Sequence, residues 1–445
     1  MSQSDWHRLL SSKRFGLEEF HDHRKDGRTE FQRDYDRLIF SAPFRRLQNK
    51  TQVFPLPGSI FVHNRLTHSL EVSSVGRSLA TNIARQLELK YQKENLPGYF
   101  SEIGSIVAAG CLAHDMGNPP FGHSGEKAIA TYFSEGKGKV LREKFSEAQW
   151  NDFISFEGNA NAFRLLTHQF NGRRQGGFVL TYATLASIVK YPYSSAHSGG
   201  KQKFGFFLSE RESFARIADD MGLMRLTDDP PKYARHPLVY PVEAADDICY
   251  QIMDLEDAYK LKLLSTEEVK QLLLGFFPEE KHSRIQETMN LVTDVNEQIA
   301  YLRSRIIGIL IDECADVFVK NETLILAGKF QGCLMDYISP EIAEAYNACS
   351  KTAFKKIYKS PDVLEIELAG YQIISTLLDK LIDAVLYPEK AYSKLLLNRI
   401  PEQYEINSDD PYIQVQSVLD FVSGMTDLYA LDLYRKITGM SLPAL

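Results

Sequence analysis

The stretch Ile103-Gly-Ser-Ile-Val-Ala-Ala-Gly-Cys-Leu-Ala113, followed by His114-Asp115-Met-Gly-Asn118-Pro-Pro, decides the fold of this chain. Its first part is apolar on nearly every side, which predicts a buried helix over residues 103–113. The glycine and the two prolines that follow end this helix. The His-Asp pair therefore lies at a buried helix end, where ionisable groups cost free energy unless a partner compensates them. A divalent cation is the simplest such partner.

The rest of the chain is also helical in pattern. Apolar residues recur every three or four positions, as at Leu79, Ile83 and Leu87, which is the period of an amphipathic helix. A two-residue alternation is clearest at residues 51–54 and 59–62, so one small β-hairpin is expected there. Residues 227–231, rich in proline, are expected to form a loop. The predicted class is all-α with one small hairpin.

Composition limits the function classes. The 445 residues carry 51 Lys and Arg against 58 Asp and Glu, a formal charge of −7, which argues against a dedicated nucleic-acid coat. No signal peptide or membrane span is expected, and the five cysteines show no CxxC pairing, so we expect reduced thiols in a cytoplasmic protein. We expect a catalytic body over residues 1–290 and a helical extension packed on it over residues 291–445. No phosphate-binding P-loop or dinucleotide fingerprint is present.

A second polar cluster follows far along the chain. Asp246, Tyr250 and Asp254 stand four residues apart, so on a helix they share one face. Taken alone, such an acidic stripe fits a solvated helix face as well as a ligand pocket, and a lone histidine such as His68 is more often a plain core or surface residue. Together, imidazoles and carboxylates suit Mn, Fe, Ni, Zn or, less well, Mg, and leave positions for water and substrate.

These residues carry a family resemblance. His68, His114-Asp115 and Asp246 resemble the H…HD…D signature of the HD-domain metal-dependent phosphohydrolases, an all-α superfamily. A longer ordered set, within residues 30–260, resembles the bacterial dGTP triphosphohydrolase branch of it. That set is Phe44-Arg-Arg-Leu-Gln-Asn-Lys-Thr-Gln52-Val53, Arg65-Leu-Thr-His68, His114-Asp-Met-Gly-Asn-Pro-Pro-Phe-Gly-His123, Phe156-Glu-Gly-Asn159 and Glu243-Ala-Ala-Asp246-Asp-Ile-Cys-Tyr250.

The resemblance implies hydrolysis of a deoxynucleoside triphosphate (dNTP) to the deoxynucleoside and inorganic triphosphate. It implies that the metal is held by His68, His114, Asp115 and Asp246, with Asp247 pointing elsewhere. The leaving 5′-alkoxide needs a proton, and His123 is the expected general acid because it lies in the loop beyond the metal pair. Glu126, three residues later, is expected to orient the His123 ring.

The resemblance and the charge of the substrate also suggest binding residues. Arg65, Asn118 and Lys190, with its neighbour Tyr191, are expected near the phosphates. Gln52 and Asp254 resemble residues that bind the 3′-hydroxyl, and Tyr250 resembles a ring that excludes a 2′-hydroxyl. Val53 and Asn159 are expected to line the nucleoside pocket. The dGTP preference comes from the family name, and no single residue indicates it.

Two other functions fit part of this pattern. The same metal site could act on a nucleoside monophosphate, a cyclic nucleotide or a guanosine alarmone, although Gln52, Tyr250 and Asp254 argue against it. A non-catalytic dNTP sensor would have no need of both His123 and Glu126. The family resemblance further implies a homo-oligomer, a tetramer or hexamer, and regulation by a dNTP activator. Nucleic acid is at most a secondary partner.

Overall fold

The computed structural model describes residues 4–19, 27–54, 62–92, 98, 100–197 and 203–441. Over these residues the chain is built from helices, with one two-stranded antiparallel sheet formed by β1 (Arg225–Thr227) and β2 (Lys232–Tyr233). The predicted all-α class is therefore confirmed. No helix in these ranges is both long and apolar enough to cross a membrane.

The predicted position of the hairpin is wrong over its first strand. Residues 51–54 form bends, and Thr51 makes one isolated antiparallel bridge to Asn64. Residues 55–61, which include most of the second predicted strand, lie outside the described residues. The hairpin that the structure contains joins β1 to β2 through a turn at residues 228–231, so the expected loop at 227–231 is present except at Thr227, the last residue of β1. The strands of this hairpin are too short for the two-residue alternation to be visible in the sequence.

The first hydrophobic core surrounds the long helices α4 (Arg65–Lys90), α5 (Ile103–Ala113), α11 (Val239–Lys260) and α14 (Val295–Leu326). The helix predicted over residues 103–113 is confirmed at both ends, and its side chains are almost all buried. It packs between α4 and α11, so the His-Asp pair at its end emerges in the middle of the core. Helix α2 (Glu30–Ile39) covers another side of α5.

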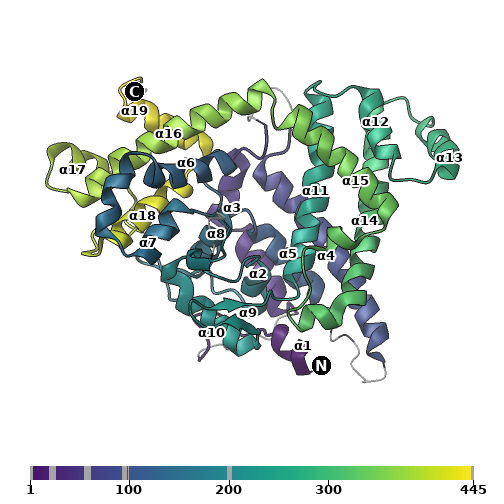
Figure 1. Ribbon diagram of the computed structural model, residues 1–445, viewed down its shortest axis with the longest axis horizontal. Coiled ribbons are helices and arrows are strands. Elements are labelled where there is room, and N and C mark those ends of the chain that lie inside the picture. The colour runs from purple at the N-terminus through teal and green to yellow at the C-terminus, as the bar shows by residue number, and fades with distance from the viewer. Residues whose placement is uncertain are drawn as a thin grey trace.

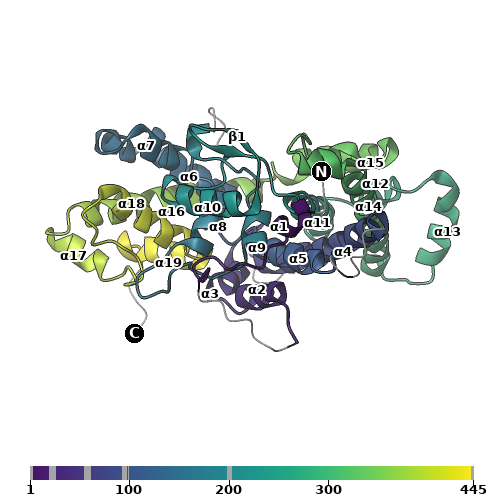
Figure 2. The ribbon, with the colours of Figure 1, turned by 90° about the horizontal axis from the view of Figure 1, so that it is seen from below.

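The second core lies at the other end of the molecule, as Figures 1 and 2 both show. It is formed by α6 (Gly122–Ser134) and α7 (Glu147–Ile154) together with three helices near the C-terminus: α16 (Pro361–Leu386), α18 (Pro411–Ser423) and α19 (Asp427–Ile437). The α5–α6 loop, residues 114–121, therefore passes from the first core to the second. The predicted division of the chain at residue 290 stays a prediction.

The remaining helices complete both parts. The short helices α8 and α9 are largely buried, and α12, α13 and α15 extend the first core. The α-helices are α1 (Ser4–Leu9), α3 (Ala42–Arg46), α8 (Gly158–Thr167), α9 (Tyr182–Ser187), α10 (Arg211–Met221), α12 (Thr266–Leu274), α13 (Glu279–Met289), α15 (Pro340–Thr352) and α17 (Ala391–Leu397). The short 3₁₀ and π turns are η1 (Leu47–Asn49), η3 (Lys137–Lys144), η4 (Ser195–His197), η5 (Leu208–Glu210), η6 (Leu334–Tyr337) and η7 (Ala353–Ile357).

Candidate active site

His68 is placed by the start of α4. Asn64 caps this helix: its side chain accepts a hydrogen bond from the Thr67 N–H at 3.0 Å, and the Thr67 hydroxyl accepts one from the Asn64 N–H at 3.1 Å. This reciprocal cap determines where the first turn begins. His68 therefore lies in that first turn, and it is buried.

His114 and Asp115 follow directly from the end of α5. The Nδ1 atom of His114 lies 2.6 Å from the carbonyl oxygen of Cys111, to which it donates a hydrogen bond. This contact places the ring proton on Nδ1 and leaves Nε2 free to bind a metal. Over the described residues, Nε2 is buried without a hydrogen-bond partner, which is costly unless a ligand normally occupies that position.

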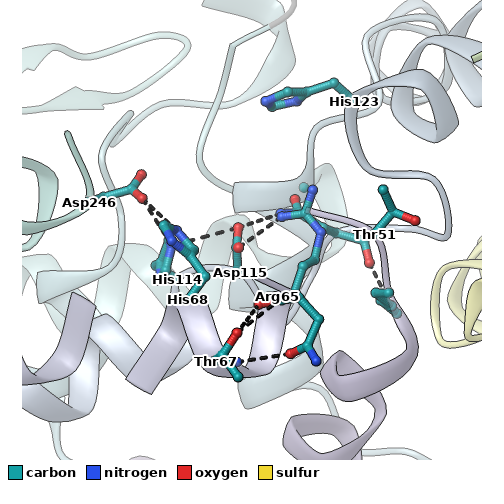
Figure 3. A network of polar contacts seen from close by, with 12 residues as sticks. Thr51, Arg65, Thr67, His68, His114, Asp115, His123 and Asp246 are labelled. Atoms are coloured by element: carbon teal, nitrogen blue, oxygen red, sulfur yellow. Dashed lines mark hydrogen bonds and ion pairs between the residues drawn. The ribbon is translucent and has the colours of Figure 1, made fainter. Parts of the chain in front are cut away.

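Asp246 approaches the same point from α11. Its Oδ1 atom lies 3.0 Å from Nε2 of His68 and 3.5 Å from Nε2 of His114 (Figure 3). His68, His114 and Asp115 also offer ligand atoms within 4.8 Å of one another. The neighbouring Asp247 was expected to point elsewhere, yet it lines the same cavity. Burial and the charge of Asp246 raise the pKa of Asp247 to about 7, so it is the poorer metal ligand.

The charges in this cluster are tightly balanced. Burial acts to lower the pKa of His114, but the carboxylates of Asp115 and Asp246 outweigh it and raise that pKa to about 9. Burial acts to raise the pKa of Asp246, but His114 and His68 outweigh it and hold that pKa well below its usual range. A bound cation would take over the role of these protons, since metal ligands must be deprotonated.

Arg65 and Asn118 hold the carboxylate of Asp115 in place. Arg65 Nη1 donates to Asp115 Oδ2 at 2.8 Å, and the Asn118 side-chain amide donates to the other carboxylate oxygen. Burial acts to raise the pKa of Asp115, but Arg65 lowers it below its usual value. Gly117 allows the α5–α6 loop to lie directly against α8, because a Cβ at this position would lie 2.1 Å from the backbone nitrogen of Ala162.

The donor set therefore fits a divalent metal ion. Two imidazole nitrogens and one carboxylate oxygen, from His68, His114 and Asp115, lie within 4.8 Å of one another, and Asp246 contacts both imidazoles. Over the described residues one imidazole nitrogen is buried without a hydrogen-bond partner, and Asp115 is oriented by second contacts of the kind that metal ligands usually have. The cluster of His68, His114 and Asp115 is positioned to hold such an ion. The predicted need for a metal cofactor is confirmed, and the donor types do not select one metal.

His123 lies across the site from this cluster. It projects from the first turn of α6 toward the same space (Figure 3), and its side chain is 69% exposed. Its Nδ1 atom is 2.8 Å from Oε2 of the buried Glu126, whose other oxygen accepts a hydrogen bond from the Gly158 N–H at 2.8 Å. The hydrogen bond to Glu126 raises the pKa of His123. Burial acts to raise the pKa of Glu126, but the contact with His123 lowers it.

A cavity of about 330 Å³ joins these groups. Its walls include His114, Asp115, Asp246, His123 and Glu126. Most of the residues predicted to bind substrate also line it: Gln52, Arg65, Asn118, Asn159, Lys190, Tyr191 and Tyr250. The predicted metal ligand His68 is not among the described residues that line the cavity, and neither are two of the predicted substrate-binding residues. These two are Val53, which is half-buried against the first core, and Asp254.

Asp254 lies behind the cavity wall instead. It is 4% exposed, and its Oδ2 atom accepts a hydrogen bond from the Tyr358 hydroxyl at 2.5 Å. The Tyr358 ring stacks on Tyr250 with centroids 5.8 Å apart. Burial raises the pKa of Asp254 to about 7. The helical spacing correctly placed Asp254 on the same helix face as Tyr250, but η7 and the residues after it cover that end of the face.

Two lysines bring positive charge to the cavity. Lys190 pairs with Glu243 at 2.8 Å, and Lys203 pairs with Glu157 at 3.0 Å. Lys203, Glu157 and Glu243 were not predicted as site residues. Glu157 lies within the quoted motif Phe156-Glu-Gly-Asn159, and its carboxylate accepts a hydrogen bond from the Asn159 side chain at 2.6 Å. Lys203 stands in no recognisable motif, so only the structure reveals it.

Comparison with known proteins agrees with this geometry. The family model described as "HD domain" matches residues 65–174, and the one described as "Phosphohydrolase-associated domain" matches residues 337–436. A Pseudomonas aeruginosa protein named "Deoxyguanosinetriphosphate triphosphohydrolase-like protein" is 38% identical over 99% of this chain and all of its own length. This chain belongs to the HD-domain family of dGTP triphosphohydrolase-like proteins.

Other members of the family are similar over nearly the whole length. A Synechocystis protein of the same name is 37% identical over 98% of this chain and all of its own length. A Yersinia enterocolitica protein named "Deoxyguanosinetriphosphate triphosphohydrolase" is 31% identical over 92% of this chain and 93% of its own length. The family and the metal-ligand cluster together identify this member as a metal-dependent phosphohydrolase.

Proposed function

We propose that this protein hydrolyses a deoxynucleoside triphosphate, dGTP or several dNTPs, to the deoxynucleoside and inorganic triphosphate. One observation carries the proposal: a single cavity connects the metal-ligand cluster, the His123–Glu126 pair and two lysines. This arrangement suits phosphate-ester cleavage with a poor leaving group. The names of the relatives support a dNTP as the substrate.

In this proposal His68, His114, Asp115 and Asp246 hold the metal. A bound divalent ion would polarise a phosphate oxygen and lower the pKa of a coordinated water. Arg65 orients Asp115 at 2.8 Å and supplies a positive charge where negative charge develops on the innermost phosphate.

His123 supplies the proton in this proposal. Cleavage between the α-phosphorus and the 5′-oxygen leaves an alkoxide, which is a poor leaving group unless it is protonated. Because Nδ1 of His123 contacts Glu126, its Nε2 atom is free to face the cavity and give its proton to the 5′-oxygen. The carboxylate favours the protonated ring, so the acid stays charged at a higher pH than an ordinary histidine.

The phosphates need local positive charge in a protein whose formal charge is −7. Lys190 and Lys203 supply it, and each is held in place by a glutamate. Burial acts to lower the pKa of Lys190, but Glu243 raises it, so this lysine is charged in the folded protein. We assign both lysines, with Asn118 and Tyr191, to the triphosphate.

The opposite end of the cavity is assigned to the sugar and base. Tyr250 presents a ring that its stacking on Tyr358 holds in place, and this ring would exclude a 2′-hydroxyl. Gln52 has a buried Oε1 atom without a hydrogen-bond partner over the described residues, which suits a 3′-hydroxyl donor. Asp254 would bind that 3′-hydroxyl only if it gave up its hydrogen bond with the Tyr358 hydroxyl. Val53 and Asn159 remain proposed nucleoside contacts.

Product analysis tests this function. The purified protein is incubated with each of the four dNTPs and Mn²⁺ or Mg²⁺, and nucleoside, triphosphate, pyrophosphate and monophosphate are separated. Deoxynucleoside with triphosphate is expected, whereas pyrophosphate with monophosphate would contradict the proposal. Two neighbouring variants provide a matched pair: Asp246→Asn should remove activity, and Asp247→Asn should retain most of it, because only Asp246 contacts the histidines.

We also propose that the enzyme forms a homo-oligomer, a tetramer or hexamer, that responds to a dNTP activator. Leu364, Leu368 and Tyr371 form an exposed apolar stripe at helical spacing on α16, which an assembly would cover. Light scattering with and without dNTP tests this. A strict monomer in both conditions would contradict it.

A further inference from the structure

Asp427, the first residue of α19, reaches from the C-terminal helices to the segments that carry the active site. It lies within the part of the chain that matches the phosphohydrolase-associated domain, and it is 7% exposed. Its two carboxylate oxygens contact Thr51 and Phe121, which are 70 positions apart in the sequence. We infer that Asp427 is a positioning residue that joins these two segments into one active site. We call Asp427, Thr51 and Phe121 the Asp427 clamp.

The first arm of the clamp holds the segment that carries Gln52. Asp427 Oδ2 accepts hydrogen bonds from the Thr51 N–H at 2.8 Å and from the Thr51 hydroxyl at 2.5 Å. Gln52 is the next residue, and its side chain lines the cavity. The segment 51–54 forms no regular strand, and apart from the isolated bridge between Thr51 and Asn64 it has no ladder of backbone hydrogen bonds within the described residues to hold it.

The second arm holds the start of α6. Asp427 Oδ1 accepts a hydrogen bond from the Phe121 N–H at 3.0 Å. Phe121 has a φ of 62°, a left-handed conformation that strains any residue with a side chain and persists only where the surroundings impose it. The Phe121 ring also packs closely on Gly370 of α16, where a Cβ would lie 2.7 Å from the ring. His123 follows two residues later. The C-terminal helices therefore hold the turn at Phe121, and this turn determines the direction in which His123 projects.

A neighbouring lysine makes a parallel connection. Lys50 Nζ donates hydrogen bonds to the carbonyl oxygens of Asn118, in the α5–α6 loop, at 2.6 Å and of Ser423, at the end of α18, at 2.7 Å. Asn118 in turn bonds the carboxylate of Asp115. The C-terminal helices are therefore linked to the loop at two points: through Lys50 to Asn118, beside the metal-ligand cluster, and directly through Asp427 to Phe121, beside His123.

The carboxylate of Asp427 is chemically specific for this task. It accepts three hydrogen bonds, two of them from backbone N–H groups on opposite oxygens. An asparagine has only one acceptor oxygen, so in Asp427→Asn the amide NH₂ must face one of these N–H donors. One arm of the clamp is therefore lost, although the side chain keeps its size.

Hydrogen–deuterium exchange tests the positioning without depending on activity. In Asp427→Asn, exchange of the backbone N–H groups of Thr51 or Phe121 is expected to rise at least tenfold, together with that of their neighbours. The matched control is Tyr412→Phe, because the Tyr412 hydroxyl bonds the buried Asp152 at 2.7 Å and also ties α18 to α7, away from the cavity. Unchanged exchange in Asp427→Asn, or an equal rise in Tyr412→Phe, would overturn the inference.

Kinetics then test the consequence, which rests on the proposed function. In Asp427→Asn, kcat is expected to fall at least tenfold while half-saturation by Mn²⁺ changes less than threefold, because no metal ligand is touched. Thr51→Ser, which keeps the hydroxyl, should stay within twofold of the parent, and Thr51→Val should fall several-fold. A kcat loss in Asp427→Asn no larger than that in Tyr412→Phe would refute the positioning role. A parent protein inactive on every dNTP would refute the proposed function alone, since the exchange result stands independently.

Discussion

The pair formed by His123 and Glu126 leads to a prediction about pH. In Glu126→Gln the amide oxygen can still accept the hydrogen bond from Gly158, but an NH₂ group faces His123 in place of a carboxylate. The pKa of His123 should then return toward its ordinary value of about 6.5. A ring with that pKa is about 76% protonated at pH 6 and about 3% protonated at pH 8. Because a general acid must carry its proton, kcat relative to the parent should fall between pH 6 and pH 8 by up to ~25-fold.

The assay is kcat for one dNTP from pH 6 to pH 9, at saturating metal, for the parent and for Glu126→Gln. The parent should keep its activity to higher pH, because Glu126 raises the pKa of His123 and activity is lost only as pH rises through that value. His123→Ala is the reference. This variant should have a kcat lower by a factor of ~10²–10⁴, and its kcat should not fall further as pH rises through the pKa of His123. If the decline in Glu126→Gln falls at the same pH as in the parent, His123 is not the acid or Glu126 does not tune it.

Three further predictions concern the metal-ligand cluster and the core. Removing divalent ions with a chelator should abolish hydrolysis, and added Mn²⁺ should restore it; activity that survives thorough chelation would contradict the metal assignment. Arg65→Met removes the positively charged partner of the buried Asp115 carboxylate and leaves it only the neutral amide of Asn118 among the two side chains that hold it. The free energy of unfolding of the metal-free protein, measured in urea, should fall by about 3 kcal/mol, and Mn²⁺ should restore part of it. The buried His236 bonds Leu9 and Leu238, and burial lowers its pKa to about 4. Between pH 6.5 and pH 4 His236 is therefore protonated in the unfolded chain but not in the folded protein. The free energy of unfolding should fall by about 3 kcal/mol as pH drops through that window. His236→Gln should lack this part of the pH dependence.

Much of this protein could be predicted from local sequence. The apolar run of α5 predicts its own burial and length, because a helix without a polar face has no side to offer to water. That burial places His114 and Asp115 in the core, where the free-energy cost of ionisable groups indicates a cation. The spacing of Asp246, Tyr250 and Asp254 gives their shared helix face for the same local reason. These features depend on residues within a few turns of one another.

Only the tertiary structure decided how distant segments meet. It brought Asp246 to the two histidines, added Lys203 to the cavity wall, and placed the Tyr358 hydroxyl on Asp254. It also placed Asp427 of α19 against Thr51 and Phe121, where it completes the hydrogen bonding of segments that form neither helix nor sheet. The reason is that helical periodicity specifies which face of a helix is apolar. It does not specify which helix will cover that face, and the covering helix determines which polar groups meet.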